Sequence, residues 1–235
     1  MNEVITVNGD SSAARLMEVQ RRIAAACGRC GRDPETVQLL AVSKTVAPEA
    51  VRALYDCGQR IFGESRIQEA VQKIPLCPGD IQWHMIGHLQ TNKVAAAVRG
   101  FSVFHSLDSL RVIQALGSAA EIAGSRVQAY LQVNVSGESA KYGMAPADLP
   151  EALEVLSEIY SIEVAGLMTI PPFAPDPEAA RPHFRALREL RDRTEAACNC
   201  SLPGLSMGMT HDLEVAVEEG ATCVRVGSAL FGERR

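Results

Sequence analysis

A lysine stands where one buried strand is predicted to end and a helix to begin. In LLAVSKTVAPEAV, residues 39–51, the apolar run ends at Val42, Lys44 follows, and Pro48 opens a helix-like segment. A lysine amine becomes a nucleophile where a dry site or a nearby positive potential disfavours its charged form, and it then forms Schiff bases with aldehydes. A lysine at a strand end also commonly extends its charged head into solvent. For Lys44 considered alone, the solvent-exposed interpretation is favoured.

Two loops late in the chain, SMGMTHD and RVGSALFG, have a composition suited to phosphate binding. In such loops glycine lets the backbone approach a phosphate, and N–H groups at the start of the following helix bind the anion. Gly208 and Gly227 would allow the close approach, and Thr210 and Ser228 would supply hydroxyl groups. Ordinary strand-to-helix loops also contain glycine and hydroxyl caps, so either loop alone is only weak support.

The elements that must position these residues alternate between short apolar runs and helix-like segments. Eight runs predict strands, namely VQLLAVS, QRIFG, IQWHMIG, FSVFHSL, VQAYLQVNV, IEVAGLMTI, LPGLSM and TCVRVG. Eight such βα units in 235 residues predict a single (β/α)8 barrel of the TIM type, with an open doubly wound sheet as the alternative. The carboxyl ends of the barrel strands would bring Lys44 and both loops to one face.

A helix is predicted ahead of the first strand, and a single domain for the whole chain. Apolar residues recur at helical spacing between residues 11 and 29, where Ser11 or Ser12 could cap the helix. No linker rich in proline, glycine or serine divides residues 1–235. We expect residues 1–10 to be disordered.

The composition argues against several classes of partner. The net charge is −5, the basic residues are scattered and aromatic residues make up 5% of the chain, so a nucleic-acid-binding surface is not expected. No signal peptide or membrane-spanning run occurs, which predicts a cytoplasmic protein without a membrane partner. Seven cysteines, an odd number spread along the chain, indicate reduced thiols.

Two short patterns resemble redox or metal sites. The pair Cys27 and Cys30 has CxxC spacing but lies at the predicted end of the first helix, where no helix N-terminus would lower a thiol pKa. In HMIGH, His84 and His88 lack the intervening glutamate of a zinc protease and lie in a strand-like context. No metal site is therefore expected, and His84 is interpreted as a strand-end residue.

Considered together, the strand-end motifs resemble the pyridoxal phosphate homeostasis proteins, which share the barrel domain of alanine racemases. The motifs, in order, are AVSKT, IFGES, WHMIGHLQTNK, HSLDSLR, LQVNVSGESAKYGM, GLMTIPP and LSMGMTHDLEVAVEEGATCVRVGSALFG. The resemblance runs from about residue 37 to residue 232. Ser65 and Arg66 depart from it, because the family usually has an asparagine followed by an aromatic residue there.

The resemblance implies a set of cofactor-binding residues. Lys44 would carry pyridoxal phosphate as a Schiff base, and Arg225 would face the pyridine nitrogen. Because arginine cannot lend the ring a proton, the cofactor would be a weaker electron sink than one facing an aspartate. The remaining predicted contacts are Thr210, Gly227 and Ser228 to the phosphate, Ser206, Met207 and Gly208 in the loop that shapes its site, and Ser65 and His84.

The resemblance favours a cofactor carrier over an enzyme. A racemase needs a second acid or base on the cofactor face opposite the lysine, and in alanine racemases an additional β domain supplies it. This chain ends a few residues after VRVGSALFG, so we expect no catalytic residues and a monomer that passes pyridoxal phosphate to apo-enzymes for vitamin B6 homeostasis. The alternatives are a pyridoxal phosphate-dependent amino-acid racemase or lyase, and a cofactor-free Schiff-base aldolase.

Overall fold

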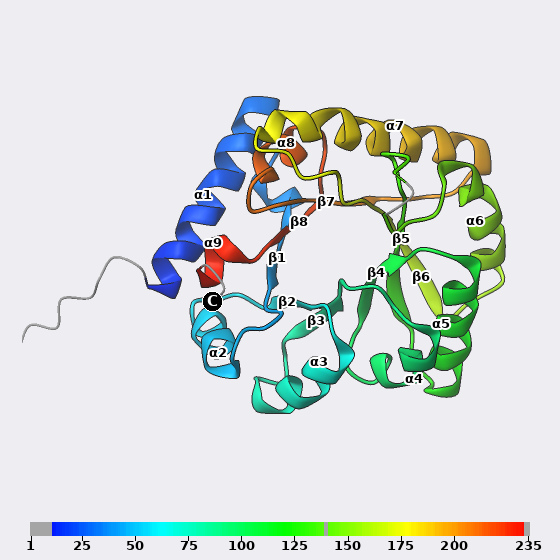
Figure 1. The fold of residues 1–235 in the computed structure, drawn as a ribbon, viewed down its shortest axis with the longest axis horizontal. Coiled ribbons are helices and arrows are strands. Elements are labelled where there is room, and N and C mark those ends of the chain that lie inside the picture. Colours follow the sequence, from blue (N-terminus) through cyan, green and yellow to red (C-terminus); the bar gives the residue numbers. More distant parts are fainter. Residues whose placement is uncertain (1–10, 139–140, 233–235) are drawn as a thin grey trace, which may run out of the picture.

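A closed barrel of eight parallel strands forms the centre of the computed structural model, which describes residues 11–138 and 141–232 (Figure 1). The strands follow one another in chain order, and the last pairs with the first. They are β1 (Gln38–Val42), β2 (Ile61–Glu64), β3 (Gln82–Met85), β4 (Val103–Leu107), β5 (Val127–Gln132), β6 (Ile162–Met168), β7 (Gly204–Met209) and β8 (Cys223–Val226). The predicted (β/α)8 barrel is confirmed, whereas residues 1–10, predicted to be disordered, lie outside the described residues.

Helices surround the barrel and connect its strands. They are α1 (Ser12–Cys30), α2 (Pro48–Asp56), α3 (Ile67–Lys73), α4 (Val94–Ala97), α5 (Leu110–Ile122), α6 (Leu149–Ser157), α7 (Arg181–Cys198), α8 (Leu213–Glu218) and α9 (Ser228–Phe231). Short 3-10 turns are η1 (Pro34–Thr36), η2 (Ile74–Leu76), η3 (Thr91–Lys93), η4 (Pro146–Asp148) and η5 (Pro177–Ala180). No helix in the described part of the chain is long and apolar enough to cross a membrane.

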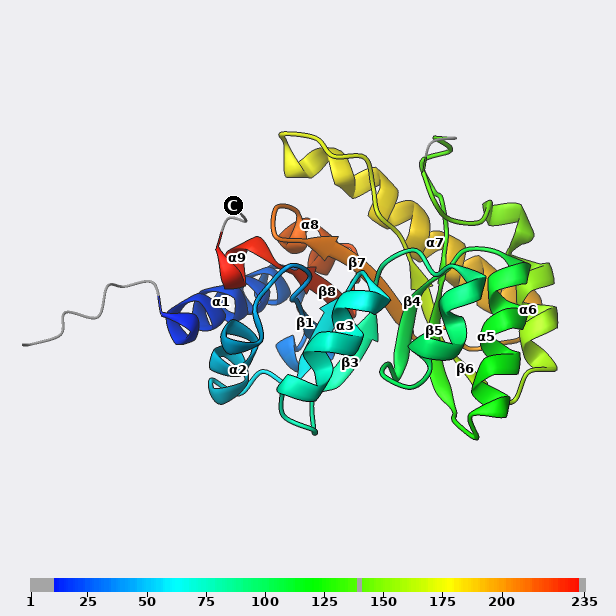
Figure 2. The ribbon, with the colours of Figure 1, turned by 60° about the horizontal axis from the view of Figure 1, so that its bottom comes forward.

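The predicted N-terminal helix is α1, which packs on the outside of the barrel. Ser11 caps it by accepting a hydrogen bond from the Ala14 N–H, and Gly31 ends it in the left-handed conformation, at a φ of 69°. Its apolar stripe packs toward α8 and α9, so the first helix of the described chain lies beside the last (Figures 1 and 2). These contacts join the first and last elements that the structure describes.

Alternation along the strands divides the core into two regions. Phe62, Trp83 and Phe104 point outward into the layer between strands and helices, where burial of each such side chain contributes about 1.5–3 kcal/mol. Apolar residues from β1, β4, β5, β6 and β8 form two smaller clusters that are separate from this layer. His84 and His105 alternate with the outward-facing Trp83 and Phe104 and point into the barrel. The barrel interior therefore contains buried polar side chains beside the two apolar clusters.

Candidate functional site

A cavity of about 730 Å³ opens at the carboxyl ends of the strands. Its size is in the range of small-molecule and cofactor sites. Six of the ten predicted site residues line it, from β1, β2, β7 and β8 or the loops that follow these strands: Lys44, Ser65, Thr210, Arg225, Gly227 and Ser228. The structure thus brings a lysine, an arginine and several hydroxyl groups to one cavity.

The loop between β1 and α2 places Lys44 in the cavity. The strand ends at Val42, the side chain of Ser43 turns outward to Glu64, and Lys44 lines the cavity wall. Thr45, the next residue, has a φ of 62°, which is uncommon for a β-branched residue. The chain then turns into α2, which has Pro48 in its first turn, as predicted.

Arg225 reaches the cavity from β8 although it is almost entirely buried, with 5% of its surface exposed. One terminal nitrogen donates to Ser206 Oγ at 2.6 Å and the other donates to the Thr169 carbonyl at 2.9 Å. Burial lowers the pKa of this guanidinium, which nevertheless remains a cation because arginine does not release its proton in proteins. The site therefore has a fixed positive charge held by neutral groups.

Two buried histidines continue the hydrogen bonds from Arg225 into the barrel. His105 Nδ1 lies 2.8 Å from Ser206 Oγ, and its Nε2 lies 3.0 Å from His84 Nδ1. Tyr130 stacks on His105, with 4.5 Å between the ring centroids. Burial lowers the pKa of His84 to about 4. Burial also lowers the pKa of His105 well below its usual value, and electrostatic interaction with His84 and Arg225 lowers it further. We call Arg225, Ser206, His105 and His84 the polar floor.

The predicted contacts Ser206 and His84 therefore do not line the cavity but connect to it through Arg225. His84 is 3% exposed and Ser206 is fully buried, so both lie in the barrel beneath the cavity lining. His84 Nε2 is buried and has no hydrogen-bond partner among the described residues. The side chain belongs to the support of the site rather than to its lining.

Met207 and Gly208 also lie outside the cavity lining. Met207 is fully buried in the outer core, because it neighbours the inward-pointing Ser206 and so points the opposite way. Gly208 has a φ of 91°, and a Cβ there would lie 2.5 Å from Ala216 Cβ. Glycine is thus required at this position by both backbone and packing, with no need to invoke a bound phosphate.

The loop between β7 and α8 is held from both sides. Its Thr210 lines the cavity, while the Thr210 carbonyl accepts a hydrogen bond of 2.8 Å from Arg22 of α1. Arg22 also forms a two-point ion pair with Glu214, and Asp212 Oδ1 accepts the Met209 N–H at 2.6 Å. The N-terminal helix thereby fixes the loop that was predicted to contact phosphate.

The outer rim of the cavity carries aromatic and apolar side chains that the sequence motifs did not single out. Tyr142 stacks on His88 with 4.5 Å between the ring centroids, and His88 Nδ1 lies 2.9 Å from Asp108 Oδ2. Phe173 and Ile170, from the proline-rich loop after β6, complete this part of the rim. The signal available in the sequence was one aromatic residue, Tyr142 or Phe173, in each of the segments that follow the fifth and sixth predicted strands.

Comparison with known proteins places the chain in a family. The sequence profile described as "Alanine racemase, N-terminal domain" matches residues 15–235. The chain is 45% identical to the "Pyridoxal phosphate homeostasis protein" of Aquifex aeolicus over 226 residues, which cover 96% of this chain and 99% of that protein. The Escherichia coli K12 protein of the same name is 38% identical, with 94% and 96% covered.

The chain belongs to the alanine racemase N-terminal domain family. The resemblance to pyridoxal phosphate homeostasis proteins, predicted from the strand-end motifs, is confirmed.

Solved structures agree with this assignment. PipY of Synechococcus elongatus is 37% identical, and its structure with pyridoxal phosphate bound superposes with a TM-score of 0.80, covering 91% of this chain and all of that chain. Without pyridoxal phosphate the TM-score is 0.82. Alanine racemase from Corynebacterium glutamicum shares the fold at 16% identity and a TM-score of 0.66, and this chain covers 61% of its length.

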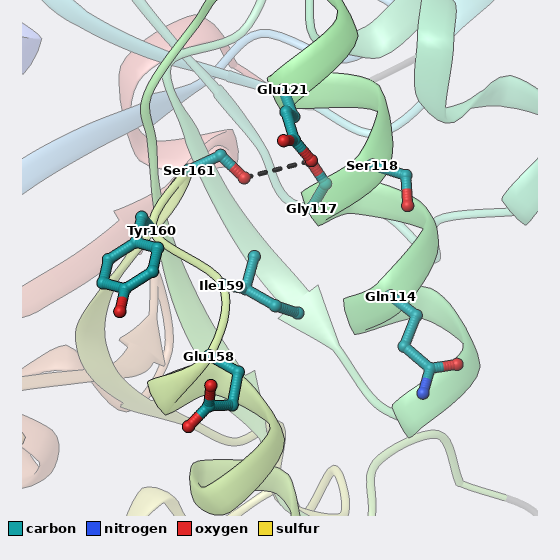
Figure 3. Close-up of a pocket in the computed structure, with 8 residues that line it drawn as sticks. All are labelled: Gln114, Gly117, Ser118, Glu121, Glu158, Ile159, Tyr160 and Ser161. Carbon is teal, nitrogen blue, oxygen red and sulfur yellow. Dashed lines mark hydrogen bonds between the residues drawn. The ribbon is translucent and has the colours of Figure 1, made fainter.

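A second cavity in this family member, of about 340 Å³, lies between α5 and the connection from α6 to β6 (Figure 3). Ser161 donates a hydrogen bond of 3.0 Å to the Gly117 carbonyl across it. Its charged lining residues are Glu121 and Glu158, both acidic. It borders the start of β6, far from the strand ends that form the mouth, and its charge is unsuited to a phosphate.

No group of three or more histidine, cysteine or acidic side chains is placed to hold a metal ion among residues 11–138 and 141–232. Cys27 and Cys30 lie at the end of α1, as predicted from the sequence, and the structure shows Cys27 buried and Cys30 exposed.

Proposed function

We propose that this protein holds pyridoxal phosphate as a Schiff base of Lys44 and delivers it to apo-enzymes, as a cytoplasmic monomer. The observation that carries the proposal is the single cavity lined by an amine, a buried guanidinium and hydroxyl-bearing loops, from Lys44, Arg225, Thr210 and Ser228. The names of the relatives and the cofactor bound to PipY point to the same ligand.

The donor set fits the three functional parts of pyridoxal phosphate. The neutral amine of Lys44 would attack the aldehyde carbon, a C=N bond would form, and the aldehyde oxygen would leave as water. The reaction is reversible, because water can attack the same carbon and return the free amine. A holder that must release its cargo needs this reversibility, and the bound form keeps the reactive aldehyde from other amines.

The last two loops suit the phosphate group. Gly227 and Ser228 begin α9, and Thr210 faces them from the preceding loop, so hydroxyl and backbone N–H donors come from two neighbouring loops. Arg22 binds the Thr210 carbonyl, so this residue of the cavity lining is fixed through its backbone. The phosphate would therefore be bound by groups that are already in place.

Arg225 suits the pyridine nitrogen. Its guanidinium is a permanent donor that cannot give up its proton, so the ring nitrogen would accept a hydrogen bond without being protonated. When bound in this way, pyridoxal phosphate withdraws electrons weakly and supports carbanion chemistry poorly. This chemistry supports storage over catalysis.

The decisive experiment measures the near-visible absorbance of the native protein before and after borohydride reduction, with mass spectrometry to locate the modified residue. We expect a band that disappears on reduction and a pyridoxyl group on Lys44. Lys44→Ala should abolish both, while Lys93→Ala, a lysine outside the cavity lining, should retain them. A colourless protein that takes up no added pyridoxal phosphate would rule the proposal out.

A second measurement separates a carrier from an enzyme. The loaded protein is mixed with L- and D-amino acids, and both the chirality of the amino acid and the release of pyridoxal phosphate are followed. The carrier function predicts transfer to an apo-enzyme without net conversion of amino acids. Sustained turnover would replace it with a racemase or lyase.

A further inference from the structure

We propose that Glu69 and Lys73 of α3 are positioning residues for Lys44, because they fix the peptide groups on both sides of its Cα. The inference rests on the proposed function in that Lys44 is the residue to be positioned. Both side chains come from the outside of the barrel, where α3 packs against β2 (Figure 1). Neither lines the cavity.

The backbone next to Lys44 is strained. Thr45 has a φ of 62° and is one of two non-glycine residues with a positive φ in the described chain. The other, Asn199, ends α7, where asparagine is well tolerated. A β-branched residue in this conformation is unfavourable and persists only where surrounding contacts hold it. The loop that carries Lys44 therefore depends on contacts outside itself.

Two side chains of α3 supply those contacts. Lys73 Nζ donates to the Ser43 carbonyl at 2.7 Å, which fixes the peptide group before Lys44. Glu69 Oε1 accepts the Thr45 N–H at 2.6 Å, which fixes the peptide group after it. With both peptide planes held, the direction in which the Lys44 side chain leaves the backbone is determined.

Lys73 and Glu69 are themselves fixed by further hydrogen bonds. Lys73 Nζ lies 2.7 Å from Glu69 Oε1 and 2.7 Å from Glu64 Oε1, and Glu64 Oε1 also accepts the Ser43 hydroxyl at 2.7 Å. Lys73 is 4% exposed and Glu64 is fully buried. The ammonium has three donors, and the Ser43 carbonyl, Glu64 and Glu69 match that number. Its role is therefore to position the loop, not to bind a ligand.

Loss of this support has a chemical consequence at the cavity. Without its acceptor, the Thr45 N–H no longer favours the positive φ, and Thr45 relaxes toward the ordinary negative range. The peptide group between Lys44 and Thr45 then rotates, and the amine moves relative to Arg225 and the phosphate loops. Misplacement by about 1 Å can slow a reaction by about a hundredfold.

The test compares Glu69→Ala with three other variants. Glu69→Gln keeps an acceptor oxygen for the Thr45 N–H. Thr45→Gly combined with Glu69→Ala removes the strain, because glycine adopts a positive φ freely. Glu189→Ala is the matched control, since Glu189 forms the i, i+4 pair with Arg193 on α7, at 3.9 Å, away from the cavity.

The first readout needs no cofactor. Hydrogen exchange of the Thr45 amide should become at least about tenfold faster in Glu69→Ala, because its hydrogen bond is lost, and should stay unchanged in Glu189→Ala. The second readout is the rate at which borohydride-trapped pyridoxal phosphate accumulates on Lys44. We expect it to fall about tenfold or more in Glu69→Ala and to recover in Glu69→Gln and in the Thr45→Gly double variant.

Unchanged exchange together with an unchanged trapping rate in Glu69→Ala would overturn the inference, as would an equal loss in Glu189→Ala. A trapping rate that the Thr45→Gly change fails to rescue would overturn the role of strain. A wild-type protein that forms no adduct on Lys44 would overturn the proposed function instead, and the exchange comparison would still decide whether Glu69 holds the loop.

Discussion

The polar floor inside the barrel and the α3 cluster outside it, formed by Lys73, Glu64 and Glu69, support the same cavity by different electrostatic means. In the floor, neutral side chains hold one guanidinium, since burial and the charge of Arg225 keep His105 unprotonated. The α3 cluster balances an ammonium against carboxylates, one of which, Glu69, reaches solvent with 24% of its side chain exposed. The stability of the polar floor should therefore depend on pH, whereas the α3 cluster should be destabilised when one member of its ion pairs is removed.

The largest effect on stability is expected from a substitution that breaks the α3 cluster. Lys73→Met should lower the free energy of unfolding by about 3–5 kcal/mol, because Glu64 would remain as a buried carboxylate without its cation. Urea denaturation followed by circular dichroism measures this. Adding Glu64→Gln to Lys73→Met should recover at least half of the loss. A loss below about 1 kcal/mol in the single variant would show that the pair is not coupled in this way.

The next effect tests the sensitivity of the floor to protons. His84 has a pKa of about 4 in the native protein against an ordinary value of 6.5. Between these two values the imidazole is protonated in the unfolded chain but stays neutral in the native state. Stability is therefore lost as the pH falls from about 6.5 toward 4, by about 1.4 kcal/mol per pH unit for this residue. Between pH 7 and pH 5, wild type should lose about 2 kcal/mol more than His84→Gln in urea denaturation. Equal losses would contradict the neutral buried histidine.

A third prediction separates the two ends of the floor. Ser206→Ala removes the hydroxyl that joins Arg225 to His105, and should lower the free energy of unfolding by about 1.5 kcal/mol, because a hydrogen bond to a charged group is lost. The affinity for pyridoxal phosphate, measured by absorbance titration, should fall with it as Arg225 loses its orientation. Ser136→Ala, a serine in a loop outside the cavity lining, serves as the control. An unchanged affinity would show that the Thr169 carbonyl alone orients Arg225.

The smallest expected effect tests whether the pH dependence of stability at Glu64 is opposite in sign to that of the polar floor. Burial raises the pKa of the Glu64 carboxyl despite its hydrogen bonds to Lys73 and Ser43. Lowering the pH therefore stabilises the native state at Glu64, whereas it destabilises the native state at His84. Glu64→Gln should therefore change the free energy of unfolding at pH 7 by less than about 1 kcal/mol, and should remove the part of the pH dependence due to this carboxyl. A loss above about 2 kcal/mol at pH 7 would show that the ion pair with Lys73 outweighs burial.

The sequence predicted the barrel and the cavity face because both depend on local pattern. Eight apolar runs separated by helix-like segments leave few topologies open, and a parallel barrel places every strand end on one face. Lys44, Arg225 and the two loops therefore lie together although they are far apart in the chain. Their contacts with a bound cofactor stay predictions.

Other features were hidden because they depend on side-chain direction and depth. Three consecutive residues such as Ser206, Met207 and Gly208 cannot all face one side of a strand, and alternation along the strand could have removed Met207 in advance. Lys73 gave no signal, because a lysine four residues after a glutamate is typical of any solvent-exposed helix. Only the packing of α3 against β1 and β2 shows that its ammonium is buried.

The seam between β1 and β8 has a consequence for the timing of synthesis. Lys44 follows β1, Arg225 lies on its neighbour β8, and Arg22 of α1 holds the loop beside them, so segments that are far apart in the sequence complete one cavity. A ribosome produces the amino end first, and pairing across such a distance forms late in folding. Under the proposed function, Lys44 would therefore leave the ribosome long before the loops predicted to bind phosphate, and selective binding of pyridoxal phosphate would have to wait until β8 and the loop after it are in place.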